Sequence, residues 1–207
     1  MNVPDAIVTA IRIKGFVSPS DLAFCLGISA DEANTEIEHL RSRELISESR
    51  LGFKLTEVGK SAAARVIEKE RAAVDAGELE AAYELFDSLN GPLKDIITAW
   101  QSREIDGEEV PNDHSDSTYD ASVISDLESL DDKARDLFVA LAELKSRLKQ
   151  YGPRFQRAML EIRSGNSRFV AAPILDSYHT IWFELHEDLI TLSGRTRADE
   201  ASKGKAL

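Results

Sequence analysis

The sequence is poor in cysteine, in aromatic residues and in long apolar runs. Cys25 is the one cysteine among 207 residues, so no disulfide can form within the chain, and a cysteine-ligated zinc site is not expected. No run of about 18 apolar residues occurs, and the N-terminus lacks a basic segment followed by an apolar block. These absences predict a protein of the reducing cytoplasm, with no membrane-spanning helix, no membrane partner and no secretory signal.

Basic residues are also in deficit, and they are unevenly spread. The net charge of −12 argues against a protein that coats nucleic acid or an anionic membrane nonspecifically. Residues 1–76 carry ten Lys and Arg against twelve Asp and Glu, whereas the remaining chain carries fifteen against twenty-five. Most of the acidity therefore lies outside the first third of the chain.

Motifs that carry catalysis are missing as well. The sequence has no glycine-rich phosphate loop, no G-x-S-x-G, no H-E-x-x-H and no C-x-x-C. The many carboxylates are typical of solvated helix faces. We therefore expect no enzyme, no catalytic residue, no cofactor and no bound metal.

Alanine, leucine and glutamate crowd long stretches, which favours a mainly α-helical fold. Cap signals delimit short helices near the N-terminus. Ser18 and Pro19 suit the start of one helix, and Gly27 suits the turn that ends it. Ser29 and Glu32 have the spacing of a capping box that starts the next helix.

The period of the apolar residues changes after this third helix. Two short extended runs flank Leu51 and Gly52, which indicates a β-hairpin. Helical spacing then resumes and continues to about residue 76. The predicted order is helix, helix, helix, hairpin and helix.

Two segments of this region resemble the winged helix-turn-helix of bacterial regulators of the MarR and related types. They read DLAFCLGISADEANTEIEHLRSRELI, residues 21–46, and FKLTEVGKSAA, residues 53–63. The matching positions are Leu22, Ala23, Leu26, Gly27, Ile28, Ser29, Leu40, Leu45, Ile46, Leu55, Thr56 and Gly59. The resemblance covers about the first third of the chain. It implies a winged helix-turn-helix domain over residues 1–76, with three helices, a short β-hairpin wing and double-stranded DNA as partner.

The third helix is the one that would read DNA, yet the centre of its outward face carries no basic residue. Asn34 can pair with adenine and Glu38 can accept a hydrogen bond from cytosine, while cations near the wing contact phosphate. The expected DNA-binding residues are Asn34, Thr35, Glu38, Arg41, Arg43, Arg50 and Lys54. In the alternative reading the carboxylates are merely solvated, or the winged helix is retained for contacts with a protein.

Residues 77–207 are expected to form an α-helical bundle that serves dimerisation or effector binding. Heptad-like apolar stripes run through residues 78–102 and 127–150. Asn90-Gly91-Pro92 predicts a kink, or two abutting helices, within the first stripe. Residues 103–122 are acidic and poor in apolar side chains, so they predict a surface loop.

Two more helices are expected near residues 153–164 and 168–193. The stretch from residue 145 to 168 is basic. We expect its cations to pair with the acidic residues of 104–126, in the same subunit or in a partner. The alternative is that they receive an anionic ligand such as a phosphate or a carboxylate.

The last helix carries a candidate small-molecule pocket. His179 and His186 are seven residues apart and so share one helix face, with Trp182 beside them. The alternative is that both histidines are hydrogen-bonded in a core or a dimer interface. One helix cannot chelate a metal through residues two turns apart, which stand about 10 Å from one another. Residues 176–192 also resemble helical regions linked to phosphoenolpyruvate-utilising, dikinase-like proteins of actinobacteria, which implies an accessory role in that metabolism.

The sequence as a whole favours a DNA-binding transcriptional regulator that acts as a homodimer. The striped helices would pack across the two-fold axis and set the spacing of two DNA-reading helices. A small-molecule effector would act by changing that spacing. The rival interpretation is a non-enzymatic interaction module that docks on a partner protein.

Overall fold

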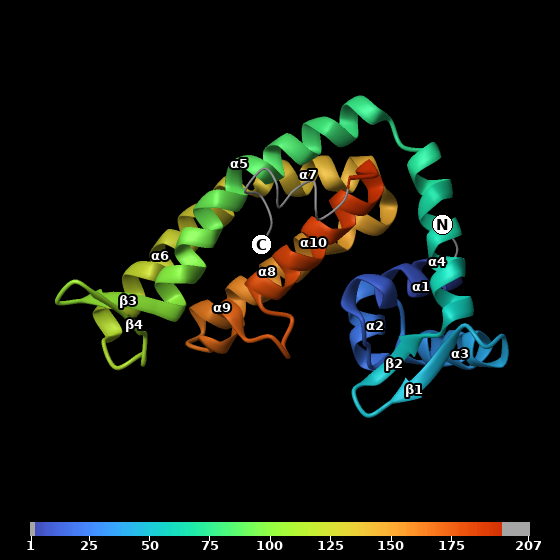
Figure 1. Ribbon diagram of the computed structural model, residues 1–207, viewed down its shortest axis with the longest axis horizontal. Coiled ribbons are helices and arrows are strands. Elements are labelled where there is room, and N and C mark those ends of the chain that lie inside the picture. Colours follow the sequence, from blue (N-terminus) through green and yellow to red (C-terminus); the bar gives the residue numbers. More distant parts are fainter. Residues whose placement is uncertain (1–2, 196–207) are drawn as a thin grey trace.

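The computed structural model describes residues 3–195 of the chain (Figure 1). The outermost residues of both predicted domains, 1–2 and 196–207, lie outside the described part. The fold is mainly α-helical, as the composition predicted, and its strands form two small antiparallel hairpins. None of the helices between residues 3 and 195 is both long enough and apolar enough to cross a membrane.

The first part of the chain, the N-terminal unit (residues 3–72), follows the predicted order of elements. These are α1 (Val3–Lys14), α2 (Pro19–Leu26), α3 (Ala30–Ser42), β1 (Ile46–Ser49), β2 (Gly52–Leu55) and α4 (Glu57–Ala72). An isolated bridge between Val17 and Phe53 adds the segment before α2 to the edge of the β1–β2 hairpin. The apolar faces of all these elements form one hydrophobic cluster, with Ile7, Leu22, Leu40 and Ala63 fully buried.

Local hydrogen bonds explain where α2 and α3 begin and end. Ser18 and Asp21 form a capping box at the start of α2, and Gly27 ends that helix in the left-handed conformation with φ 64°. The Ser29 side chain accepts a hydrogen bond from the Glu32 backbone and so caps α3. Both hydrogen bonds of a capping box are therefore present at α2. At α3 the bond is the one that the Ser29 side chain accepts from the Glu32 backbone amide.

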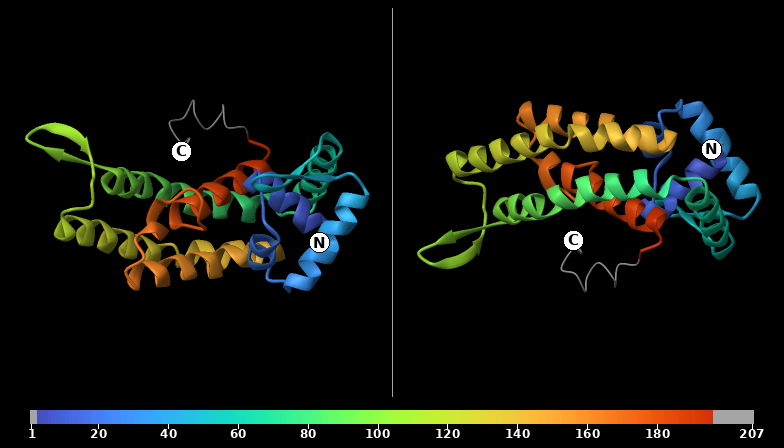
Figure 2. Two further views of the ribbon diagram at one scale, coloured as in Figure 1. Left: turned by 90° about the horizontal axis from the view of Figure 1, so that it is seen from below. Right: turned by 90° about the horizontal axis from the view of Figure 1, so that it is seen from above.

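The rest of the chain forms a helical bundle (residues 76–193). Its elements are α5 (Ala76–Gln101), β3 (Ser102–Ile105), β4 (Glu108–Pro111), α6 (Ser117–Lys133), α7 (Arg135–Leu144), the 3-10 helix η1 (Ser146–Gln150), α8 (Tyr151–Arg163), α9 (Arg168–Ala171) and α10 (Tyr178–Ser193). The long α5 runs beside the successive helices α6 and α7, and α10 packs against α5 and α8 (Figure 2).

The predicted loop over residues 103–122 is wrong. Asp106 and Gly107 both adopt positive φ, 54° and 83°, which is the geometry of a two-residue hairpin turn, and β3 pairs with β4 around them. Asp116 then caps α6 through the backbone amides of Thr118 and Tyr119. The acidic composition concealed an Asp-Gly turn signal and a helix cap, both of which act locally.

The predicted helix boundaries in the bundle also need correction. α5 continues through Asn90-Gly91-Pro92, so the alternative of two abutting helices is wrong. The stretch expected to be helical from residue 127 to 150 is interrupted after Lys133 and again after Leu144. The last predicted helix is divided as well, since Pro173 separates α9 from α10.

Trp182 lies at the centre of the bundle core. Its ring is fully buried and stacks on Phe86 with 4.8 Å between ring centroids. The indole Nε1 donates a 3.1 Å hydrogen bond to Oδ1 of Asn90, a residue of α5 that is itself 3% exposed. The polar side chain of Asn90 is thus a hydrogen-bond acceptor within the core, and Asn90 does not mark a break in the helix.

Gly59 and Gly91 give a matched test of packing. A Cβ on Gly59 would lie 1.9 Å from the Leu45 carbonyl oxygen, so Gly59→Ala must push α4 away from the hairpin. We expect a loss of about 2 kcal/mol or more in the free energy of unfolding. A Cβ on Gly91 would meet nothing within 4 Å, so Gly91→Ala in the middle of α5 should stabilise the protein by about 0.5–1 kcal/mol. Urea unfolding measures both, and equal stability of the two variants would contradict this packing.

Candidate functional site

The bundle packs on one side of the N-terminal unit and leaves the other side open. α10 contacts α1 and α4, and η1 contacts α2. The principal contacts of α3, by contrast, are with α1, α2 and β1. The outer face of α3 and the β1–β2 hairpin therefore face away from the bundle (Figure 1). This open side is the first candidate surface for a partner.

All seven residues expected to contact DNA are exposed. They are Asn34, Thr35, Glu38 and Arg41 on α3, Arg43 at its C-cap, Arg50 at the hairpin turn and Lys54 in β2. Arg41 and Glu38 form an ion pair of 2.8 Å, and the Thr35 hydroxyl donates to the Asp31 carbonyl oxygen. The Asn34 side-chain amide, in the exposed first half of α3, has no hydrogen-bond partner among residues 3–195.

Lys54 belongs to a separate basic hollow rather than to the face of α3. The hollow, about 560 Å³, lies between the end of α1, the hairpin and the start of α4, and its cations are Arg12, Lys54 and Lys60. Lys60 pairs with the exposed Glu57, whereas Arg12 and Lys54 have no ion pair within residues 3–195. The sequence placed Arg12 and Lys60 among the basic residues near the third helix, but not in the expected DNA-binding set.

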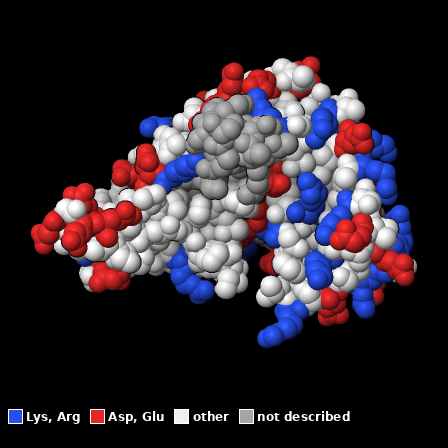
Figure 3. All heavy atoms as spheres, in the orientation of Figure 1, with Lys and Arg blue, Asp and Glu red and all other residues white. Residues whose placement is uncertain are grey.

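Charge is distributed unequally over the molecule. Figure 3 shows carboxylates gathered at the β3–β4 end of the bundle, whereas Lys and Arg are spread over the N-terminal unit. Most of the negative charge of the chain lies in the residues that follow the N-terminal unit. A polyanion would meet less repulsion at the N-terminal unit than the net charge suggests.

A buried charge network joins the N-terminal unit to the bundle. Lys14 at the end of α1 bonds to Asp176 at 3.1 Å and to Glu184 at 2.6 Å. Arg154 of α8 bonds to the same two carboxylates, at 2.5 Å and 2.6 Å. Two cations and two carboxylates therefore satisfy one another at the junction. We call these four residues the junction network.

A second buried group lies beside the junction network. Arg147 of η1 donates to both carboxylate oxygens of Glu70, in α4, and of Asp188, in α10. The Tyr151 hydroxyl donates to Asp188 at 3.0 Å. Because burying ion pairs carries a desolvation penalty, we assign both groups to fixing the orientation of the two parts rather than to net stability.

The pKa values at the junction reflect this pairing. Burial alone would raise the pKa of Asp176, but hydrogen bonds and charge from Arg154 and Lys14 outweigh it and hold that pKa below 3.8. Burial and Arg154 oppose the charge of Lys14, yet Glu184 and its neighbours raise the pKa of this ammonium. Burial raises the pKa of the nearby Cys25 thiol, which leaves it protonated and unreactive at neutral pH.

The predicted pocket residues of α10 belong to the packed bundle. Trp182 is fully buried, and the His186 ring is 5% exposed and stacks 4.9 Å from Phe86. His179 is half-buried, and burial lowers its pKa. Within residues 3–195 no group of three or more His, Cys, Asp or Glu could hold a metal ion. This arrangement matches the alternative in which the histidines are part of a core.

The predicted pairing of the basic stretch with residues 104–126 is wrong for Arg147, Arg154 and Arg163. The first two pair with Glu70, Asp176, Glu184 and Asp188, as described above. Arg163 bonds to Glu128 at the surface, at 2.7 Å. The true partners are spread from α4 to α10, so composition along the chain could not reveal them.

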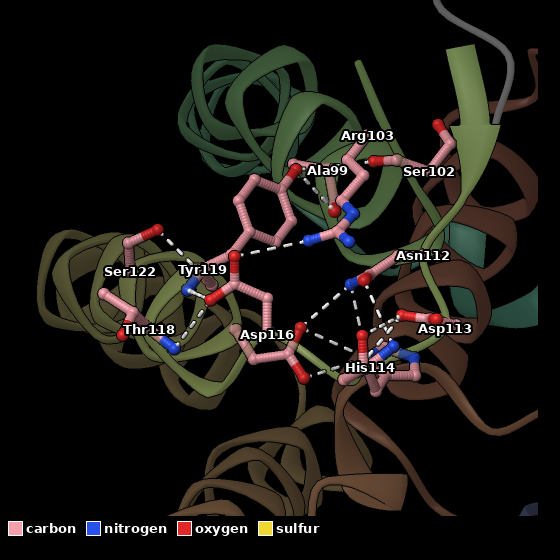
Figure 4. A network of polar contacts seen from close by, with 12 residues as sticks. Ala99, Ser102, Arg103, Asn112, Asp113, His114, Asp116, Thr118, Tyr119 and Ser122 are labelled. Carbon is pink, nitrogen blue, oxygen red and sulfur yellow. Dashed lines mark hydrogen bonds and ion pairs between the residues drawn. The ribbon is translucent and has the colours of Figure 1, made fainter. Parts of the chain in front are cut away.

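The acidic end of the bundle contains a polar network around His114 (Figure 4). His114 contacts the Asp120 carboxylate at 3.0 Å and packs on Trp100 with 4.4 Å between ring centroids. Asn112 donates to the Trp100 carbonyl oxygen and to Asp120. These bonds fasten the β3–β4 hairpin to α5 and α6, so we interpret the network as structural.

Comparison with known proteins adds no relative: no protein-family model matches the chain, and no curated protein and no solved structure matches it significantly. The candidate sites therefore rest on the geometry given above.

Asp176 gives a test of the junction network. Asp176→Asn leaves Lys14 and Arg154 with one charged partner, so we expect the free energy of unfolding at about pH 7 to fall by about 2–3 kcal/mol. A lowered folded-state pKa means that the stabilisation is complete above the unfolded-state pKa and disappears as pH falls through the folded-state value. The gap between wild type and variant should therefore shrink as the pH falls below 3.8.

Urea unfolding at several pH values measures this gap. Asp132→Asn is the matched control, because Asp132 is exposed and pairs only with the neighbouring Arg135. It should change stability little at any pH. A constant gap for Asp176→Asn down to about pH 2 would show that its charge does not stabilise the fold.

Proposed function

We propose that residues 3–72 form a winged helix-turn-helix and that the chain is a DNA-binding transcriptional regulator of the bacterial cytoplasm, without a catalytic step. The order of elements supports this, since α2 and α3 meet at the Gly27 turn and are followed by a hairpin and α4. The bridge between Val17 and Phe53 supports it further, because it adds a third short strand segment to the wing.

The observation that carries the proposal is the open side of the N-terminal unit. A helix that reads DNA needs a free outer face, and its N-terminal residues approach the base edges. Asn34 and Thr35 lie in the first half of α3, exposed and turned away from the bundle. Asn34 has the amide geometry for a bidentate contact with adenine.

Cations near the wing supply the phosphate contacts that α3 lacks. Phosphate contacts provide much of the affinity for DNA, and they need Lys, Arg or backbone amides. Arg50 is exposed at the tip of the hairpin. The basic hollow of Arg12, Lys54 and Lys60 offers further positive charge on its flank.

We propose a homodimer, because two copies of α3 at a fixed spacing read a two-fold symmetric site. Three exposed apolar residues lie on three different helices of the bundle. They are Leu85 on α5, Val139 on α7 and Leu160 on α8, the latter two 58% exposed each. Their burial across a two-fold axis would contribute favourably to association.

A specific observation favours a second candidate function, docking on a protein. Asp31, Glu32 and Glu38 are all exposed on α3, and a basic protein surface would complement them better than DNA does. In this case the winged helix is an interaction module. An accessory role in phosphoenolpyruvate-utilising, dikinase-like metabolism is one setting for such a module.

Selection from fragmented DNA of the source genome tests the leading proposal. The purified chain should enrich a palindromic site, and binding should weaken steeply as salt rises. The double variant Arg50→Glu and Lys54→Glu should lose at least about tenfold in affinity, because it places charge of the wrong sign at phosphates.

The matched control reverses two exposed cations of the bundle, Lys133→Glu and Arg135→Glu, with the same change in net charge. This control should bind as the wild type does. No enrichment by the folded wild type at low salt, or equal losses in both double variants, would reject sequence-specific binding through the wing.

Base reading by α3 is tested separately. Asn34→Ala should weaken binding to the selected site by about tenfold or more and leave binding to unrelated duplexes unchanged. Fluorescence anisotropy with both duplexes measures the difference. For the docking function, Asp31→Lys with Glu38→Lys should abolish capture of the partner protein, whereas Asn34→Ala should not affect it.

A further inference from the structure

The β3–β4 hairpin projects from one end of the bundle (Figure 2). Its turn and the adjoining strand residues, 104–109, carry carboxylates but no Lys or Arg, and we call them the acidic tip. The carboxylates are Glu104, Asp106, Glu108 and Glu109, all exposed. Ile105 lies among them and is 43% exposed. The acidic tip thus presents one large apolar side chain surrounded by negative charge.

Carboxylates oppose one another across the two strands of this hairpin. Glu104 is directly opposite Glu109, and Glu108 is the preceding residue of β4. Like charges in directly opposed positions destabilise a hairpin. Among residues 3–195 no Lys or Arg forms an ion pair with the acidic tip, although Glu109 accepts a hydrogen bond from the Ser102 hydroxyl. A cationic surface brought by another molecule would relieve the repulsion.

The basic hollow on the N-terminal unit has the complementary composition. Among the residues that line it, the cations Arg12, Lys54 and Lys60 outnumber the one carboxylate, Glu57. Phe16 also lines the hollow and is 43% exposed. Both surfaces therefore combine an exposed apolar side chain with charges of one sign, and the two signs are opposite.

The two surfaces of one chain cannot meet. The acidic tip lies at one end of the long axis of the molecule, whereas β2 and the start of α4, which border the hollow, lie at the other (Figure 1). The 26 residues of α5 alone separate its two ends by about 39 Å. Any contact between tip and hollow must therefore join two molecules.

We propose that the acidic tip of one chain docks in the basic hollow of a second copy. Ile105 packs against Phe16, and the glutamates of the tip pair with Arg12, Lys54 and Lys60. Two copies that lie antiparallel make the same contact twice, so the assembly closes as a two-fold dimer. Because the tip is small, charge rather than buried area provides most of the affinity, and salt weakens the contact.

The regulatory consequence of this contact rests on the proposed function. Lys54 lines the hollow and is also one of the residues expected to contact DNA, so a docked tip and DNA exclude one another there. The docked dimer is therefore a DNA-free state. By linkage, DNA opposes docking by the same factor by which docking opposes DNA. Docking itself does not depend on DNA.

Cross-linking between two cysteine variants of the full chain tests the contact. Ser47→Cys places a thiol in the hollow, and Ile105→Cys places one at the tip, where cysteine remains a small apolar residue. The two chains are mixed at low salt, without DNA, with a short bismaleimide. We expect the mixed product to exceed either same-variant product by at least about tenfold, and to disappear at about 0.5 M salt.

Cysteine controls define the background of this reaction. Glu143→Cys places a thiol on the exposed face of α7, away from the tip, and should give only background product with Ser47→Cys. The native Cys25 is buried, so the wild type should give none.

Charge reversal in the two cysteine chains tests the pairing. The hollow is reversed by Lys54→Glu with Lys60→Glu, and the tip by Glu104→Lys with Glu108→Lys. Either reversal alone should lower the yield of mixed product by about tenfold, because like charges then meet. Combining a reversed hollow with a reversed tip should restore the yield, since opposite charges meet again.

Two observations guard against a trivial loss of folding. Replacing Glu104 by lysine removes its repulsion with Glu109, so the reversed hairpin should be no less stable than the native one. Asp126→Lys with Glu143→Lys changes the net charge equally at exposed positions elsewhere on the bundle, and should leave the yield unchanged. Circular dichroism checks the fold of each variant.

Four results would overturn the proposal. They are equal yields from the Glu143→Cys and Ile105→Cys chains, no recovery when both surfaces are reversed, a yield that salt does not change, or no mixed product while a lysine-rich peptide binds the tip. The last result would assign the tip to a foreign basic partner. Failure of the genomic selection with intact cross-linking would reject only the DNA function. Intact selection without cross-linking would reject only the docking of two copies.

Discussion

The sharing of two carboxylates by two cations at the junction is the constraint on which the arrangement of this protein depends. Lys14 and Arg154 come from the two parts of the chain, and Asp176 and Glu184 bond to both of them. Removing any one group leaves a buried charge without its full complement, which is strongly unfavourable. Each part contains its own hydrophobic cluster, so apolar packing within the parts does not dictate their relative orientation. The directional hydrogen bonds of the junction network determine this relative orientation instead.

This orientation determines which surface of the N-terminal unit meets a partner. The Glu70–Arg147–Asp188 group and the bond from Arg71 to the Thr191 carbonyl oxygen hold the end of α4 against η1 and α10. With the ends of α1 and α4 fixed, α3 and the hairpin are turned away from the bundle. The exposure of Asn34 and Arg50 is thus a consequence of contacts made on the opposite side of the unit.

The sequence predicted those features whose causes are local. Ser18, Gly27 and Ser29 act through neighbouring backbone groups, and the order of elements in the N-terminal unit followed from them. Gly59 was one of the positions of the resemblance to a winged helix, and its close approach to the Leu45 carbonyl oxygen explains the requirement for glycine. The Asp106-Gly107 turn was equally local, but the acidic composition around it hid the signal. The junction network could not be predicted, because its members are up to 170 residues apart.

The junction network also forms part of a cleft between the two parts of the molecule. Three of its four residues, Lys14, Asp176 and Glu184, line the cleft between α2 and the segment that links α9 to α10. A change in the packing of this cleft would therefore act directly on the bonds that orient α3.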